Sequence, residues 1–121
     1  MKILVLESSG LVASVAVVTE EKLIGEYTTN FKKTHSQTLL PMMDTLLPVQ
    51  EMDAIAVSGG PGSFTGLRIG SATAKGLGLA LSIPIISVPT VDAIAYNLCG
   101  TDAVVCPLMD ARRNQTYTGL Y

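Results

Sequence analysis

The sequence predicts an α/β fold in which a mixed sheet carries helices on its faces. Three short apolar runs with brief links open the chain, at residues 2–6, 14–18 and 22–29, as in an antiparallel meander. After Thr34 the apolar residues recur at helical spacing, and further along the chain short apolar strands alternate with helical segments. A meander followed by strand and helix alternation favours a sheet with both parallel and antiparallel pairs.

The later elements follow from period, turn and capping signals. The first helix begins near Thr34, capped by that residue or by Ser36, and includes Pro41, which kinks the helix or shifts its start. Ser63 or Thr65 can cap the second helix, and Thr90 the third. The expected bounds are 64–81 and 90–99 for these two helices and 53–58, 85–88, 104–109 and 116–121 for the remaining strands.

Composition indicates one compact domain and narrows the classes of function. The chain has 121 residues, of which 48% are hydrophobic and 15% charged, so it can bury a core. Its net charge is -2 and it has no tryptophan, whereas a protein that holds nucleic acid by itself needs a basic face and stacking aromatics. No apolar run suits a signal peptide or a membrane span, and Cys99 and Cys106 suit free thiols. We therefore expect a cytoplasmic protein whose contact with any nucleic acid is indirect.

A glycine-rich turn at residues 59–62 joins the fourth strand to the second helix. Its glycines allow close approach of backbone, and the amides of a helix N-terminus can bind an anion. The Walker A spacing is absent, however, and Gly60, Gly62 and Gly66 miss the dinucleotide fingerprint by one residue. Anion binding and a plain tight turn both stay open. The same choice applies to Glu7, Ser8 and Ser9, which either meet a phosphate or form a capped turn.

The second helix carries a stripe of small residues, in which Gly66, Gly70, Ala74 and Gly78 recur at every fourth position. A glycine inside a helix costs about 1 kcal/mol relative to alanine, so close approach of a second helix or of the sheet must offset the loss. That contact lies within the chain or on a partner. The first helix has an apolar arc wide enough for a partner as well, including Leu39, Met42, Met43 and Leu46.

Four segments together form the pattern of one family. The longest, residues 58–77, reads S-G-G-P-G-S-F-T-G-L-R-I-G-S-A-T-A-K-G-L. The others are I-L-V-L-E-S-S at 3–9, H-S-Q-T-L-L-P-M-M-D-T-L-L at 35–47 and D-A-R-R-N-Q-T-Y-T-G-L-Y at 110–121. These segments resemble the TsaB family, also called YeaZ, the bacterial partner subunits in threonylcarbamoyladenosine synthesis on tRNA. The resemblance implies an actin-like, sugar-kinase and Hsp70-like fold with a ribonuclease H-like lobe. We expect residues 1–121 to be the first lobe alone, with the second lobe absent from this chain.

The resemblance also implies a role. It suggests a non-catalytic scaffold or activating subunit for TsaD in threonylcarbamoyl transfer to adenosine 37 of tRNA, with TsaE as a further partner and a homodimer when the protein is alone. The two helices would form the interface through the stripe and the apolar arc. We expect no catalytic residue, no metal and no cofactor in the chain itself, with ATP or ADP in the complex, since His35 is the one histidine and the H-x-x-x-H pair of TsaD has no counterpart.

An enzyme of a different class is the alternative. In that interpretation the chain is a nucleotide-dependent phosphotransferase or ATPase of the sugar-kinase-like fold. Ser8, Ser9, Gly60 and Gly62 would then contact the nucleotide.

Overall fold

The structure is a computed structural model that describes residues 1–30, 35–46 and 48–121. The expected cap at Thr34 or Ser36 and the side chains of His35 and Leu46 lie outside this description. The elements in order are β1 (Ile3–Glu7), β2 (Ala13–Val18), β3 (Leu23–Thr29), α1 (His35–Leu46), the 3-10 turn η1 (Val49–Glu51), β4 (Ala54–Ser58), α2 (Phe64–Leu81), β5 (Ile85–Val88), α3 (Thr90–Tyr96), β6 (Leu108–Arg112) and β7 (Gln115–Thr118).

Five strands form one mixed sheet in the order β3-β2-β1-β4-β5. The opening meander pairs antiparallel, whereas β1 with β4 and β4 with β5 pair parallel. The register places Leu4 beside Ile55 and Leu6 beside Val57, so these side chains point to the same face. The predicted mixed sheet is therefore confirmed.

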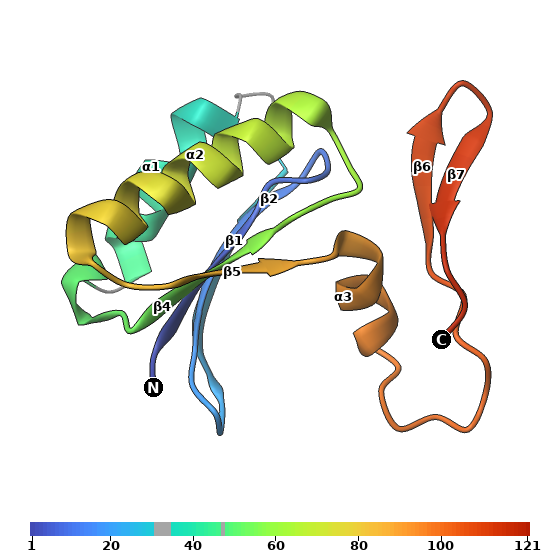
Figure 1. Cartoon of the computed structure of the whole chain (residues 1–121), viewed down its shortest axis with the longest axis horizontal. Coiled ribbons are helices and arrows are strands. Elements are labelled where there is room, and N and C mark those ends of the chain that lie inside the picture. The colour runs from blue at the N-terminus through green and yellow to red at the C-terminus, as the bar shows by residue number, and fades with distance from the viewer. Residues whose placement is uncertain (31–34, 47) are drawn as a thin grey trace.

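Helices α1 and α2 lie side by side on one face of the sheet (Figure 1). The core forms between this helix layer and the sheet, because alternate residues of β1, β2 and β4 point toward it. Its buried members include Leu4, Leu6, Val15, Val17, Leu39, Met42, Met43, Ile55, Val57 and Ala74.

The long helix α2 has the bounds that its flanking residues predict. Ser63 is the N-cap, and its hydroxyl oxygen accepts a hydrogen bond from the Gly66 amide at 3.2 Å. At the other end Ser82 adopts a left-handed conformation with φ 55°, and its amide bonds the Gly78 carbonyl. Both ends are thus set by local hydrogen bonds. Thr65 is not the cap.

The chain after β5 differs from the sequence prediction. Helix α3 ends at Tyr96, because the amides of residues 97–99 bond carbonyls three residues back and tighten the last turn. Its N-cap is Pro89, so Thr90 is the first helical residue and makes no side-chain cap. The predicted strands 104–109 and 116–121 are also shifted. Pro107 precedes β6, and β6 and β7 form a separate two-stranded sheet that extends to one side of the molecule (Figure 1).

Within the described part of the chain, no helix combines the length and hydropathy that a bilayer crossing requires.

Candidate functional site

The carboxyl ends of β1, β4 and β5 meet at one edge of the sheet, because these three strands are parallel. This edge is where open α/β sheets bind ligands. Glu7 ends β1 and Ser8 and Ser9 follow it, while the glycine-rich turn 59–62 follows β4. The structure therefore brings together the residues that the sequence suggested for anion contact.

Glu7 binds the nearest donors at this edge. One carboxylate oxygen accepts hydrogen bonds from the Ser9 amide at 2.6 Å and from the Ser9 hydroxyl, and the other accepts from the Ser58 hydroxyl. Hydrogen bonds to an ionised acceptor are stronger than neutral ones. The carboxylate therefore joins the end of β1 to the end of β4, and it occupies the place where these donors would meet an external anion.

Ser8 is buried and turned to the other face of the sheet, toward α2. Its hydroxyl donates a hydrogen bond to the Gly66 carbonyl oxygen at 2.8 Å. A hydrogen bond of this kind contributes about 0.5–1.5 kcal/mol net, so the contact fixes the first turn of α2 on the end of β1.

The glycine-rich turn is a tight junction between segments. Gly60 has φ +101°, and a Cβ on Gly62 would lie 2.5 Å from the Ser9 carbonyl oxygen. The Ser63 amide donates to that same oxygen at 2.7 Å, and the Thr90 amide donates to the Gly60 carbonyl oxygen at 2.8 Å. This geometry favours the tight-turn interpretation. Anion contact at Ser8, Ser9, Gly60 and Gly62 stays a prediction, against which these internal bonds count.

The stripe of small residues on α2 faces the chain's own sheet. Gly66, Gly70, Ala74 and Gly78 are all buried. A Cβ on Gly70 would lie 2.4 Å from the Ser8 hydroxyl oxygen, and one on Gly78 would lie 2.9 Å from the Cδ1 of Ile85. The prediction that the stripe meets a partner is therefore wrong. The sheet approaches α2 so closely that no side chain larger than a methyl group fits along this stripe.

The apolar arc of α1 is also buried within this chain. Leu39, Met42 and Met43 are buried in the core of this chain, where they pack against the sheet. They are not available to a partner in this arrangement, which corrects their assignment to an interface. Leu46, the fourth residue of that assignment, has its side chain outside the described residues.

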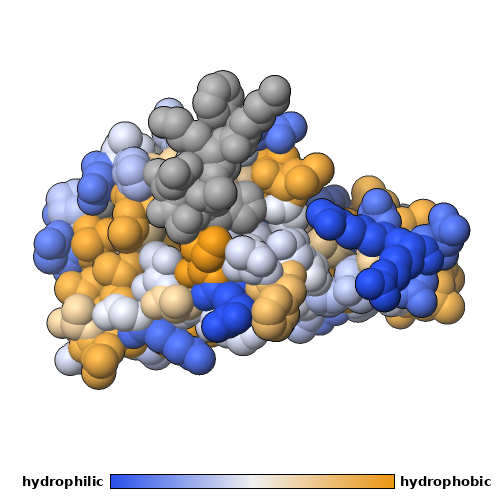
Figure 2. Space-filling view, turned by 90° about the horizontal axis from the view of Figure 1, so that it is seen from above, coloured by the Kyte–Doolittle hydropathy of each residue, from blue (hydrophilic) through white to orange (hydrophobic). Residues whose placement is uncertain are grey.

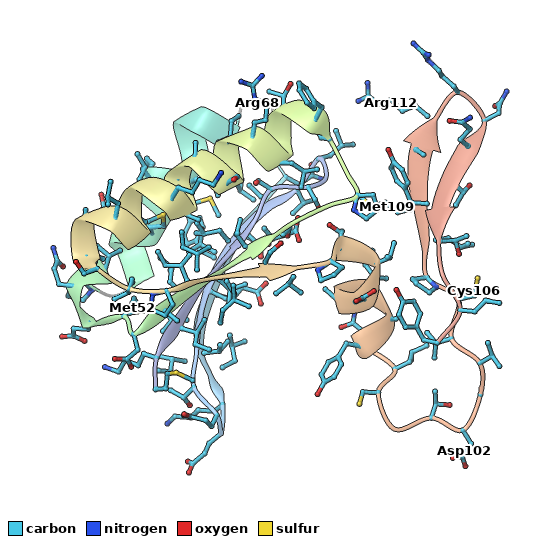
Figure 3. The ribbon with its side chains drawn as sticks, viewed as in Figure 1. Met52, Arg68, Asp102, Cys106, Met109 and Arg112 are labelled. Carbon is cyan, nitrogen blue, oxygen red and sulfur yellow. The ribbon has the colours of Figure 1, made fainter. Side chains whose placement is uncertain are left out.

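The exposed apolar residues of the helix layer lie on its outer side. Leu79 and Phe64 of α2 are 85% and 74% exposed, and Leu40 of α1 is 54% exposed. Arg68 points away from the sheet on the same side of α2 (Figure 3), and its guanidinium lies 5.3 Å from the centre of the Phe64 ring. Seen from the helix side, apolar surface gathers at the end opposite the hydrophilic hairpin β6–β7 (Figure 2). Sequence reasoning missed this surface, although residues 64, 68 and 79 share one helical face.

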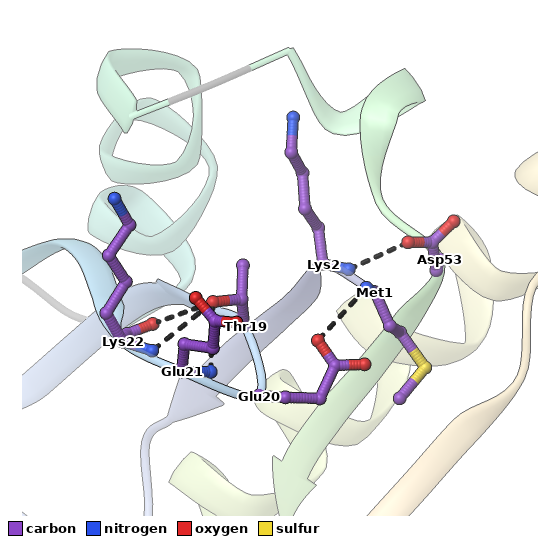
Figure 4. A network of polar contacts seen from close by, with 7 residues as sticks. All are labelled: Met1, Lys2, Thr19, Glu20, Glu21, Lys22 and Asp53. Carbon is purple, nitrogen blue, oxygen red and sulfur yellow. Dashed lines mark hydrogen bonds and ion pairs between the residues drawn. The ribbon is translucent and has the colours of Figure 1, made fainter.

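The acidic residues near the element ends serve as hydrogen-bond acceptors. Asp53 accepts from the Lys2 amide at 2.7 Å (Figure 4), and Asp110 accepts from the Arg112 amide at 2.7 Å. Asp92 accepts from the Tyr121 hydroxyl, and this hydrogen bond raises the pKa of Tyr121. In the described ranges, no three histidine, cysteine or acidic residues gather in a group that could hold a metal ion.

Comparison with known proteins identifies the family. A family model described as TsaD, tRNA N6-adenosine threonylcarbamoyltransferase, matches residues 22–121. The tRNA threonylcarbamoyladenosine biosynthesis protein TsaB of Bacillus subtilis is 40% identical over 126 aligned residues, which cover 100% of this chain and 55% of the relative. TsaB of Escherichia coli is 31% identical, with coverage of 100% of this chain and 55% of the relative.

A solved structure has the same fold. YeaZ from Pseudomonas aeruginosa superposes with a TM-score of 0.85 and 33% identity, covering 99% of this chain and 59% of that one. The chain thus spans about half the length of the curated relatives that it matches. From these matches, the chain belongs to the TsaD family of tRNA N6-adenosine threonylcarbamoyltransferases, within which it is a TsaB (YeaZ) sequence with an actin-like α/β fold.

Proposed function

We propose that this chain belongs to a non-catalytic subunit that holds TsaD in its active arrangement during threonylcarbamoyl transfer to adenosine 37 of tRNA. The names of its relatives place them in tRNA threonylcarbamoyladenosine biosynthesis. TsaD is the main partner in this proposal, with TsaE as a further subunit and a second copy of the protein when TsaD is absent. Contact with tRNA is indirect.

The observation that carries the proposal is the exposed outer side of the helix layer. Leu79, Phe64 and Leu40 are large apolar residues that stay exposed on two adjacent helices. Exposed apolar surface that spans neighbouring elements is typical of protein interaction sites. The outer side of α1 and α2, and not the buried stripe, is therefore the proposed TsaD interface.

The internal bonds at the sheet edge support the choice of a scaffold over a nucleotide-dependent phosphotransferase. A phosphate-binding role needs free donors at Ser8 and Ser9, and here the Ser8 hydroxyl donates to Gly66 while Ser9 donates to Glu7. Any ATP or ADP then belongs to the assembled complex, with no cofactor held by this chain alone.

Reconstitution tests the role. The full-length protein that contains this chain is mixed with TsaD of the same organism and the remaining components, and modified tRNA is measured with and without it. We expect modification to require the protein. Equal modification in its absence would show that it has no scaffold role.

A pair of leucine variants tests the surface. Leu79→Glu introduces a charge into the outer side of α2, whereas Leu23→Glu introduces the same charge at an exposed position of β3. We expect Leu79→Glu to weaken TsaD binding by about tenfold or more, because a buried unpaired charge is costly at an interface. Leu23→Glu should bind normally. Equal binding of both variants to TsaD, with unchanged thermal melts, would rule out the outer side of α2.

A further inference from the structure

A groove with a volume of about 720 Å³ runs between α2 and β5. Val57, Leu67 and Ile85 are apolar residues of its lining, and Phe64, Arg68 and Lys75 line it from α2. We call it the α2–β5 groove.

The floor of this groove is an incompletely covered part of the sheet. Ile55 and Ile85 are paired across β4 and β5 and point to the same face, toward the helix layer. Ile55 is fully buried under the helices, whereas Ile85 is 40% exposed. The helix layer therefore ends at α2, and the edge strand β5 has room for one more element on this face.

The charge of the groove has one sign. Arg68 and Lys75 are seven residues apart, which places them about 10 Å apart along the axis of α2. No acidic residue lines the groove, and among the described residues neither cation forms an ion pair. The hydroxyls of Ser58, Ser71 and Ser87 add neutral polar groups to the lining. An occupant that complements this surface is acidic on one side and apolar on the other.

We propose that the α2–β5 groove receives an acidic amphipathic helix of a partner protein. Its apolar side covers Ile85, Leu67 and Phe64, and two of its carboxylates, two helical turns apart, pair with Arg68 and Lys75. A helix fits because the other elements of this layer are helices, which pack at axial distances of about 8–10 Å, and because the lining of the groove follows α2 from Phe64 to Lys75. The groove shares Phe64 and Arg68 with the outer side of α2 and adds Leu67, Lys75 and Ile85, which the proposed TsaD interface does not use.

A designed peptide tests whether the groove prefers an acidic helix. The probe is a fluorescent helical peptide of about 18 residues, or five turns, with a leucine stripe flanked by two glutamates seven residues apart. The matched peptide has lysines in place of these two glutamates. We expect the glutamate peptide to bind the protein at least about tenfold more tightly by fluorescence anisotropy, with an affinity that falls as salt is added. Similar affinities for the two peptides, or no binding of either, would overturn the proposal.

Charge reversals in the protein locate the site. The double variant R68E/K75E should bind the glutamate peptide about tenfold more weakly than the wild type and should prefer the lysine peptide. The control K22E/R113E changes the net charge by the same amount at exposed positions outside the groove and should bind like the wild type. Methyl signals of Ile85 and Leu67 should shift on titration.

Three results contradict the proposal. The first is unchanged binding by a folded R68E/K75E variant. The second is a set of peptide-induced shifts that leaves Ile85 and Leu67 unaffected. The third is saturation of the groove by pyrophosphate alone, which would assign it to a small anion.

Discussion

The two sides of α2 differ in almost every respect. The inner side consists of Gly66, Gly70, Ala74 and Gly78, which are buried against β1, β4 and β5. The outer side carries Phe64, Arg68 and Leu79, which are exposed. The small residues of the stripe therefore serve the contact with the sheet, and Phe64, Arg68 and Leu79 remain for other molecules. A helix can thus have an interaction surface and a close-packed surface, and it is the close-packed one that needs glycine.

The largest effect separates a glycine of the inner side from a glycine that faces solvent. Gly70→Ala should lower the free energy of unfolding by about 1–3 kcal/mol, because its Cβ would lie 2.4 Å from the Ser8 hydroxyl oxygen. Gly76→Ala is the matched control, since no atom lies within 4 Å of its Cβ. It should raise stability by about 0.5–1 kcal/mol through helix propensity. Urea denaturation measures both, and an equal change in the two variants would contradict the assignment of the inner side.

A double-mutant cycle sharpens the same comparison. Ser8→Ala alone should cost about 0.5–1.5 kcal/mol, because the side-chain hydrogen bond between the end of β1 and the Gly66 carbonyl is lost. It also removes the oxygen nearest to a Cβ at position 70. Ser8→Ala combined with Gly70→Ala should then cost less than the sum of the two single variants, by about 1 kcal/mol. Strict additivity would mean that the two residues do not contact each other in solution.

The smallest effect concerns an exposed contact far from α2. The hydrogen bond to Asp92 raises the pKa of Tyr121 above the ordinary tyrosine value of 10.0, since the bond needs the protonated phenol. Any stability from this bond is present below the pKa of the unfolded chain and is lost as the pH rises through the folded value. Asp92→Asn should lower the pKa of Tyr121, as seen in tyrosinate absorbance. Asp102→Asn makes the same charge change elsewhere and should leave the titration unchanged, whereas an equal shift in both variants would exclude a specific bond.

Local signals in the sequence predict much of the fold. The bounds of α2 and β5 follow from Ser63, the glycine-rich turn and Pro84, which act on their immediate neighbours. The strands near residues 104–121 were misplaced, because their pairing depends on a two-residue turn at Arg113 and Asn114 and on a register shift at Arg112. All three residues have positive φ, and no glycine marks the turn.

The candidate site was only partly predictable. Spacing identifies which residues share a side of α2, so the stripe was found, but spacing does not say which side the sheet covers. Tertiary contacts decide which side of α2 faces the sheet. One of them is the hydrogen bond from the Ser8 hydroxyl to Gly66, which lies 58 positions later in the chain. Glu7 was recognised as a candidate. Its role as acceptor for Ser58 also depends on the pairing of β1 with β4.

The bond between Ser8 and Gly66 has a mechanical consequence. It fastens the start of α2 to the end of β1, one residue from the Glu7 carboxylate that joins β1 to β4. The helix therefore cannot slide along the sheet without disturbing the strand ends. A molecule that binds the solvent-facing side of α2 and shifts the helix would therefore also shift the edge where β1 and β4 terminate.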